Sequence, residues 1–262
     1  MLWSRNALAG AVFLMVSVFF PSLAPAKTGP VIAAASSMQF ALADIAAVFT
    51  RETGQNLRFS FGSSGNFARQ IRSGAPFELF IAADEDIILD LHRDGFVEDE
   101  GDVYAVGRLV LVAPHGSPLA PDRGLDGVAA MLEAGQISRF AIANPDHAPY
   151  GIRARQALEA RDIWKALQPF LVLGENVTQA AQFALSGNAE GGLTAYSLML
   201  SADIAPRGTY ALIPETAHGP LRQRMVLLPD ASNTAIAFRD FMYGDAARAI
   251  LKTYGFALPE GH

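Results

Sequence analysis

Short apolar runs alternate with amphipathic segments along most of the chain. Residues 31–35 and 109–113 are almost wholly apolar, which is typical of strands buried on both faces. Residues 38–52 instead place Phe40, Ile45 and Phe49 at helical spacing. The same criteria predict strands at 31–35, 57–61, 78–83, 109–113, 139–143, 170–173, 192–195, 210–213 and 225–228, and helices at 38–52, 66–72, 84–93, 125–133, 151–160, 177–185, 234–242 and 245–254.

Strands and helices follow one another in a β-α-β-α order. This order predicts an α/β fold in which mostly parallel sheets are covered by helices. No linker-like stretch interrupts the pattern, so any second lobe is expected to be joined through strands, which we place near residues 108–114 and 222–228. Ligand sites in such sheets lie at the carboxyl ends of strands, where strand-to-helix turns meet.

The first 26 residues have the layout of a cleaved secretory signal. Arg5 precedes an apolar stretch from Ala7 to Phe20, and Ala24-Pro25-Ala26 supplies the small residues that a signal peptidase reads. A retained membrane anchor is the alternative, but the stretch is shorter than the ~20 residues that a spanning helix needs. Cleavage after Ala26 therefore predicts export, and a cysteine-free exported protein fits a bacterial periplasm.

The composition and net charge of the chain exclude or disfavour several kinds of site and partner. The 262 residues contain no cysteine, which excludes disulfides, thiolate metal sites, a cysteine nucleophile and a lipidated cysteine. The net charge of −6 disfavours a nucleic-acid partner. The acidic run 84–86 fits the first turn of a helix better than a metal site, and basic residues such as Arg69, Arg72, Arg153 and Arg155 are predicted to lie on solvated helix faces.

Four turns share one design. Residues 33–37, 62–65, 144–151 and 174–178 each follow a predicted strand and open a predicted helix. A helix N-terminus offers unpaired backbone N–H groups and a partial positive charge, and serine hydroxyls add neutral donors. Any one turn also fits ordinary helix capping. Together the turns predict a pocket for a small anion that is held by dipoles.

The order and spacing of several motifs resemble the periplasmic molybdate/tungstate-binding proteins of ABC importers. The resemblance covers essentially the whole chain after the leader. It is carried by Ala33-Ala34-Ala35-Ser36, by Gly62 to Ile71, by Gly74 to Asp84, by Tyr104 to Leu111, by Ala141 to Gly151, by Gly174 to Val177 and by Tyr254-Gly255-Phe256.

This resemblance implies a two-lobed (type II) periplasmic-binding-protein fold with the anion in the cleft between lobes. It implies lobe 1 from residues 27–109 and 222–262, and lobe 2 from 110–221. It further implies a monomer that closes on its ligand and delivers it to a membrane ABC permease complex, with no cofactor and no metal-ligating side chain. By position, Ser36 and Ser64 would give hydroxyl and N–H contacts, Tyr150 and Val177 backbone N–H groups, and Tyr196 its phenolic hydroxyl.

The sequence is also consistent with other roles for individual residues, other ligands and other functions. Ser37 stands where the family commonly has leucine or phenylalanine, so it adds a donor or shifts the register, and otherwise serves as a cap or packs. Ser37 and Tyr150 are also where the pocket could be adapted to sulfate or another oxyanion.

A secreted serine hydrolase would use Ser64 with His147 as base, but Asn66 replaces the second glycine of a nucleophile elbow. Iron binding through Tyr150 and Tyr196 lacks accompanying carboxylates. A binding protein and no enzyme is predicted.

Overall fold

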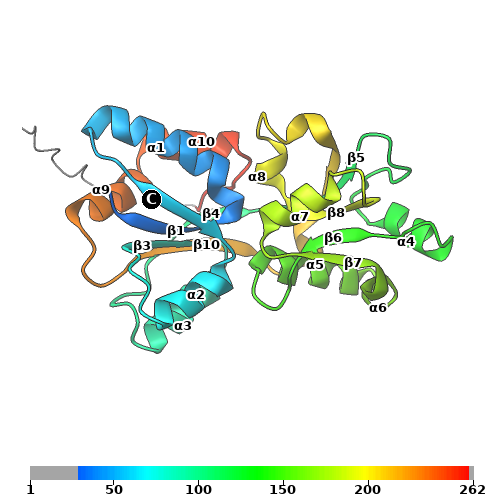
Figure 1. Cartoon of the computed structure of the whole chain (residues 1–262), viewed down its shortest axis with the longest axis horizontal. Coiled ribbons are helices and arrows are strands. Elements are labelled where there is room, and N and C mark those ends of the chain that lie inside the picture. Colours follow the sequence, from blue (N-terminus) through cyan, green and yellow to red (C-terminus); the bar gives the residue numbers. More distant parts are fainter. Residues whose placement is uncertain (1–28, 260–262) are drawn as a thin grey trace, which may run out of the picture.

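A computed structural model of the chain describes residues 29–259 as two lobes that lie side by side along the long axis (Figure 1). The predicted secretory signal lies outside the described residues. Within the described residues, none of the helices is both long and apolar enough to span a bilayer.

Each lobe is built on one five-stranded sheet. In the first lobe the strand order is β2-β1-β3-β10-β4, with β1 parallel to β2 and β3, and β10 antiparallel to β3 and β4. In the second lobe the order is β7-β6-β8-β5-β9, with β6 parallel to β7 and β8, and β5 antiparallel to β8 and β9. The strands are β1 (Val31–Ala35), β2 (Arg58–Gly62), β3 (Leu79–Ala82), β4 (Asp102–Gly107), β5 (Leu109–Pro114), β6 (Phe140–Ala143), β7 (Leu171–Gly174), β8 (Gly191–Ala195), β9 (Gly208–Leu212) and β10 (Leu221–Leu227).

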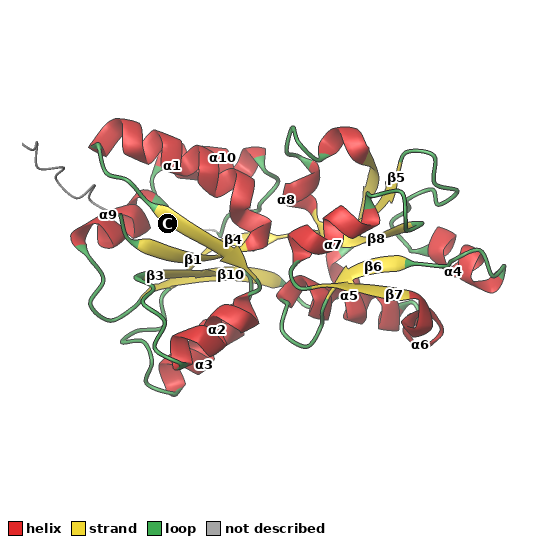
Figure 2. Cartoon of the chain, in the orientation of Figure 1, coloured by secondary structure: helices red, strands yellow, loops and turns green. Residues whose placement is uncertain are grey.

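Helices cover both faces of each sheet (Figure 2). In β1, Ile32 and Ala34 join the core under α1 and α10, whereas Ala33 joins the core under α2 and α3, as the alternation of side chains along a strand requires. The first-lobe helices are α1 (Gln39–Thr53), α2 (Ser64–Arg72), α3 (Glu85–Arg93), α9 (Asn233–Phe241) and α10 (Asp245–Thr253), and those of the second lobe are α4 (Asp126–Glu133), α5 (Pro149–Ala160), α6 (Trp164–Leu167), α7 (Val177–Ala184) and α8 (Tyr196–Met199).

The chain passes between the sheets twice. It leaves the first lobe at Arg108, between β4 and β5, and returns through residues 213–220, between β9 and β10. The β4 strand was not predicted, and β10 begins at Leu221 rather than at residue 225. Polar side chains at the start of β10 hide the strand pattern, because Gln223 is fully buried there and accepts a hydrogen bond from the Tyr104 hydroxyl at 2.8 Å.

Candidate functional site

A small cavity lies where the carboxyl ends of β1, β2 and β3 meet the N-termini of α5 and α7. It encloses about 190 Å³, solvent at the mouth included. We call it the serine-lined cavity, and none of its lining side chains is charged. They are Ala35, Ser36, Ser37, Gly62, Ser63, Ser64, Ala83, Ala148, Pro149, Tyr150 and Val177.

Two hydroxyls of the first lobe are arranged as donors toward this cavity. Ser64 opens α2 and is fully buried, and its Oγ accepts the backbone N–H of Ala83 at 2.9 Å. Ser36 opens a single 3₁₀ turn after β1, and its Oγ accepts the backbone N–H of Thr178 at 3.4 Å. A hydroxyl has one proton to donate. Neither O–H donates to another described residue, so each is available to a ligand.

Backbone N–H groups of the second lobe complete the cavity wall. Tyr150 follows Pro149 in the first turn of α5, and the capping residue Ala148 offers no side-chain acceptor there. Val177 is the first residue of α7, where the Asn176 side chain accepts the N–H groups of residues 178 and 179 and not that of Val177. The first N–H groups of a helix have no intrahelical partner. Both helices therefore present donors to an anion.

The Tyr150 side chain reaches the strands that connect the lobes. Its hydroxyl accepts a 3.4 Å hydrogen bond from the Gln223 amide. Burial raises the pKa of this phenol far above its ordinary value, so the ring stays neutral. A Cβ at Gly107 would lie 2.3 Å from the Tyr150 hydroxyl oxygen, so residue 107 has to be glycine for this phenol to fit.

Ser37 lines the cavity, although the sequence also fitted a role as a helix cap or a packing residue. Its side chain is 2% exposed, and no described residue hydrogen-bonds its Oγ with ordinary geometry. The hydroxyl does lie close enough to the Tyr150 phenol to lower the pKa of that phenol. It also caps no helix, since Ala35 holds the N-cap position of its turn. The pair of serines at the end of an apolar strand was the signal for a second donor.

Tyr196 is not among the residues that line the serine-lined cavity. Its ring lies 5.5 Å from the ring of Tyr210, centroid to centroid. On another side it packs so closely on Gly255 that a Cβ there would lie 2.5 Å from the ring. The structure thus brings Ser36, Ser64 and the two second-lobe N-termini together, and leaves Tyr196 apart from them.

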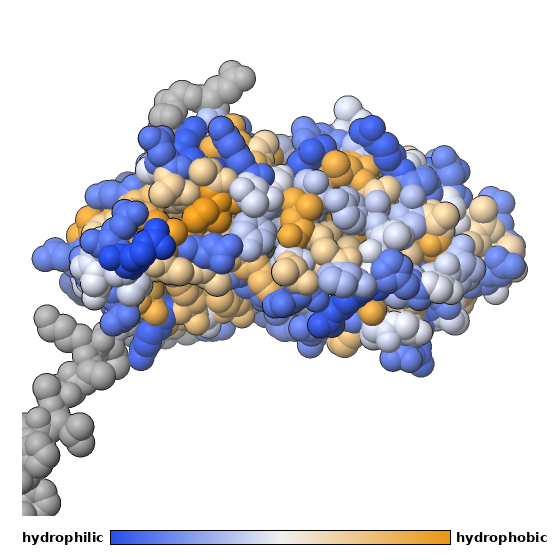
Figure 3. Space-filling model, turned by 90° about the horizontal axis from the view of Figure 1, so that it is seen from above, coloured by the Kyte–Doolittle hydropathy of each residue, from blue (hydrophilic) through white to orange (hydrophobic). Residues whose placement is uncertain are grey.

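The two lobes are in contact around the cavity. The Gly65 N–H donates to the His147 carbonyl at 3.0 Å, and Ser63 Oγ lies 2.8 Å from His147 Nδ1. The Thr178 hydroxyl donates to the Ser36 carbonyl at 3.0 Å. On the face of the molecule that Figure 3 shows, the side chains of the two lobes meet without an open channel. The molecule is therefore closed around its site.

A family model describing bacterial extracellular solute-binding proteins matches residues 30–257. The chain belongs to this family. The molybdate-binding protein ModA of Rhodobacter capsulatus is 35% identical to this solute-binding protein over 236 residues, which cover 88% of this chain and 90% of that one. ModA of Azotobacter vinelandii is 35% identical over 230 residues, which cover 87% and 89%.

Solved structures share the fold of this solute-binding protein. The Azotobacter vinelandii periplasmic molybdate-binding protein has a TM-score of 0.78 at 30% identity, covering 88% of this chain and 100% of that one. The sulfate-binding protein SubI from Mycobacterium tuberculosis has a TM-score of 0.72 at 16% identity, covering 89% and 88%. The two-lobed α/β fold predicted from the sequence is confirmed.

Proposed function

We propose that this solute-binding protein binds molybdate or tungstate in the serine-lined cavity and delivers it to an ABC importer. The observation that carries the proposal is a cavity of neutral donors, with two hydroxyls facing two helix N-termini across the lobes. Helix N-termini favour small anions, and uncharged donors bind them without a fixed ion pair. The ModA relatives at 35% identity support molybdate as the ligand.

The proposed ligand contacts come from both lobes. They are the hydroxyls of Ser36 and Ser64 and the backbone N–H groups of Tyr150 and Val177. We add the Ser37 hydroxyl, because it is buried at the cavity with no other partner of ordinary geometry. Tyr196 is left out of the set because it does not line the cavity.

This donor set selects for an unprotonated anion. Hydrogen phosphate carries a proton that needs an acceptor, and backbone N–H groups cannot accept. The Ser64 and Ser36 oxygens each already accept a backbone N–H, which uses one of their two lone pairs and reduces their capacity to accept the proton of hydrogen phosphate. Sulfate is fully ionised but smaller than molybdate, so its hydrogen bonds in the same site would be longer and weaker.

A binding role without catalysis is part of the proposal. A Ser64 nucleophile needs a base within hydrogen-bond reach. The imidazole of His147 instead lies 2.8 Å from Ser63, and Ser64 Oγ contacts the Ala83 N–H. Among residues 29–259, no three His, Asp or Glu side chains come together in a way that would hold a metal ion. Molybdenum is thus proposed to enter as its oxyanion, with no resident cofactor.

Export and lobe motion complete the proposed function. The family description is extracellular, which supports cleavage of residues 1–26 and a periplasmic location. Segments 27–109 and 222–262 would form one lobe of a monomer and 110–221 the other. Ligand that contacts both lobes favours the closed form, which the permease complex would recognise.

Calorimetry tests the proposed ligand. The mature chain, residues 27–262, would be titrated with molybdate, tungstate, sulfate and phosphate at neutral pH. We expect molybdate and tungstate to bind far more tightly than sulfate, and phosphate not to bind. Tight binding of sulfate without binding of molybdate would overturn the proposal and favour a sulfate carrier of the same fold.

A further inference from the structure

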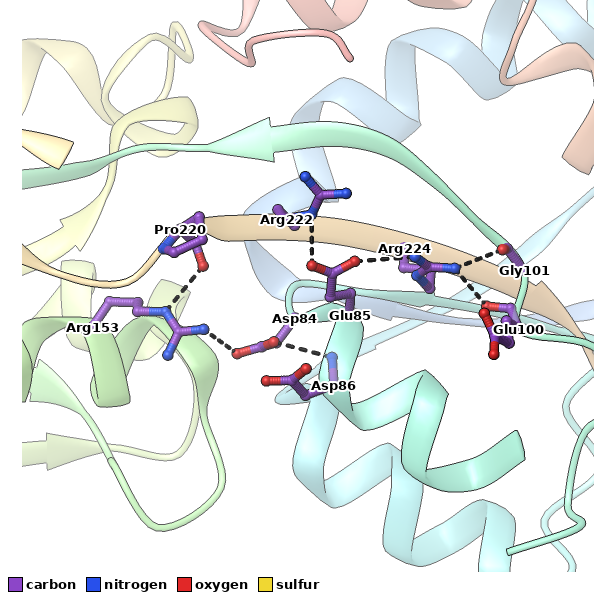
Figure 4. Close-up of polar contacts among 9 residues, drawn as sticks. All are labelled: Asp84, Glu85, Asp86, Glu100, Gly101, Arg153, Pro220, Arg222 and Arg224. Carbon is purple, nitrogen blue, oxygen red and sulfur yellow. Dashed lines mark hydrogen bonds and ion pairs between the residues drawn. The ribbon is translucent and has the colours of Figure 1, made fainter. Parts of the chain in front are cut away.

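A buried ion pair joins the two lobes beside the serine-lined cavity (Figure 4). Arg153 Nη2 of α5 lies 2.6 Å from Asp84 Oδ2, at the start of α3 in the first lobe. The two side chains are only 11% and 8% exposed. The sequence-based prediction that Arg153 lies on a solvated helix face is therefore wrong, because the helical pattern does not reveal that this face meets another lobe.

Each partner is held firmly in its own part of the molecule. Asp84 caps α3 by accepting the Asp86 N–H at 3.2 Å. Arg153 Nε donates to the Pro220 carbonyl at 3.1 Å, on the segment that returns to the first lobe. A planar guanidinium can make these two contacts at once, as Figure 4 shows.

Both partners adjoin residues of the cavity wall. Asp84 directly follows Ala83, which lines the cavity and whose N–H is bound by Ser64. Arg153 lies about one helical turn after Tyr150, whose N–H is a proposed ligand contact. The ion pair therefore fixes the position of one wall relative to the other.

No neighbouring carboxylate competes with Asp84 for Arg153, although burial raises the pKa of the Asp84 carboxyl against the effect of Arg153, and the nearby charges of Asp86 and Glu85 raise it further. Glu85 contacts Arg222 at 2.6 Å and Arg224 at 3.0 Å, on β10 of its own lobe. Burial lowers the pKa of His218, and the charge of Arg153 lowers it further, which favours a neutral imidazole beside the guanidinium. Asp84 is thus the one carboxylate in salt-bridge contact with Arg153 among the described residues.

We propose that Asp84 and Arg153 are positioning residues that hold the cavity closed on its ligand and so set the rate of ligand release. The proposal rests on the proposed function for the site of binding. Opening the lobes would return both charges to water, where they are well solvated. Removing one partner leaves an unpaired charge buried in the closed form alone, so only that form is destabilised. Ligand would then leave faster while its entry changes little.

The test compares three single variants by stopped-flow and calorimetry. Asp84→Asn removes the charge but keeps a good helix cap. Arg153→Gln removes the other charge. Arg155→Gln is the matched control, because Arg155 lies on the same helix and its 2.7 Å ion pair with Glu159 stays within the second lobe. We expect Asp84→Asn and Arg153→Gln to raise the dissociation rate and the Kd about tenfold or more, and the control to leave both unchanged.

Two further variants separate positioning from a loss of folding. The double variant D84N/R153Q should lose less affinity than the sum of the single losses, because no unpaired charge remains. Arg153→Lys keeps the charge but loses the planar guanidinium that contacts both Asp84 and Pro220. We therefore expect a dissociation rate between those of the wild type and Arg153→Gln. Melting curves without ligand should stay close to that of the wild type.

The kinetic test uses whichever of molybdate, tungstate or sulfate the wild-type protein binds most tightly. Failure of molybdate to bind would overturn the proposed function, while release of the bound oxyanion would still test the ion pair. Wild-type dissociation rates in both Asp84→Asn and Arg153→Gln would overturn the positioning role. Equal acceleration in Arg155→Gln would overturn it too.

Discussion

Backbone N–H groups orient two serine hydroxyls in this site by donating to their oxygens. Each of Ser36 and Ser64 accepts an N–H and is left with a proton to donate, so these two hydroxyls face the cavity mainly as donors. Ser36 receives its N–H from Thr178 of the opposite lobe, whereas Ser64 receives it from Ala83 of its own lobe. The Ser64 donor is therefore in place whether or not the lobes are closed.

Ser64→Ala tests this donor. Losing a hydrogen bond to a charged group costs about 1.5–3 kcal/mol, so we expect molybdate affinity to fall about tenfold to hundredfold. The matched control is Ser73→Ala, which removes an exposed hydroxyl at the end of the same helix that donates to the Arg69 carbonyl. Calorimetry would measure both, and an unchanged Kd for Ser64→Ala would exclude this hydroxyl as a ligand contact.

Tyr150→Phe separates the backbone of residue 150 from its side chain. The variant keeps the proposed N–H contact and loses the 3.4 Å hydrogen bond with Gln223. We expect a stability loss of about 1 kcal/mol in denaturant unfolding and an affinity close to that of the wild type. Tyr254→Phe, which loses the exposed contact with Asp44, is the control. A large loss of affinity would assign the phenol itself to the site.

The strand-to-helix turns in the sequence predict several residues that line the cavity. Ser36, Ser64 and Val177 each open a helical segment after a strand, and Tyr150 lies in the first turn of α5. Parallel strands bring such turns to one edge of a sheet. Their contact with ligand stays a prediction. A contact from Ser37 is likewise a prediction, and only the fold shows that its hydroxyl is buried at the cavity and caps no helix.

Element positions depend on side-chain contacts that a pattern of apolar residues does not contain. The strands and helices with regular patterns agree with the structure to within a few residues. The chain-crossing strands were less visible, since β4 follows an acidic stretch and β10 begins with polar residues that have partners on other elements. Gln223 is satisfied by Tyr104, and the terminal nitrogens of Arg224 contact Glu85 and two carbonyls just before β4.

Glu190 joins the start of β6 to β8 and makes this join sensitive to acid. Burial alone raises the pKa of the Glu190 carboxyl, but hydrogen bonds from Arg139 and Ser138 outweigh burial and hold the pKa below its ordinary 4.5. The contribution to stability is therefore complete above pH 4.5 and is lost as the pH falls through the lowered pKa.

Glu190→Gln should thus lower the melting temperature at pH 7 and have a smaller effect below pH 4. Glutamine keeps one acceptor oxygen but loses the charge that strengthens the contacts at 2.7–3.0 Å with residues 138 and 139. Calorimetric melting at both pH values would measure the difference. Glu133→Gln, on an exposed helix end, serves as control, and an effect independent of pH would contradict the assignment.

At the scale of the whole molecule, closure depends on backbones that come very near each other. The lobes meet at Gly65, whose N–H donates to the His147 carbonyl, and at the buried pair of Asp84 and Arg153. A Cβ at Gly65 would lie 2.4 Å from that carbonyl oxygen, closer than such atoms approach in proteins. Nothing in the first lobe alone demands glycine at this helical position.

Glycine at position 65 therefore lowers the stability of α2 but permits the two lobes to close. Gly65→Ala should stabilise α2 by about 0.5–1 kcal/mol while preventing full closure, so the melting temperature rises as affinity for molybdate falls. Scattering with and without molybdate would show whether the variant stays extended. A variant that melts higher and still closes would contradict this reading. Selection for uptake would thus keep a helix weaker than it could be, and a search for stabilising mutations would select a protein that releases its cargo too early.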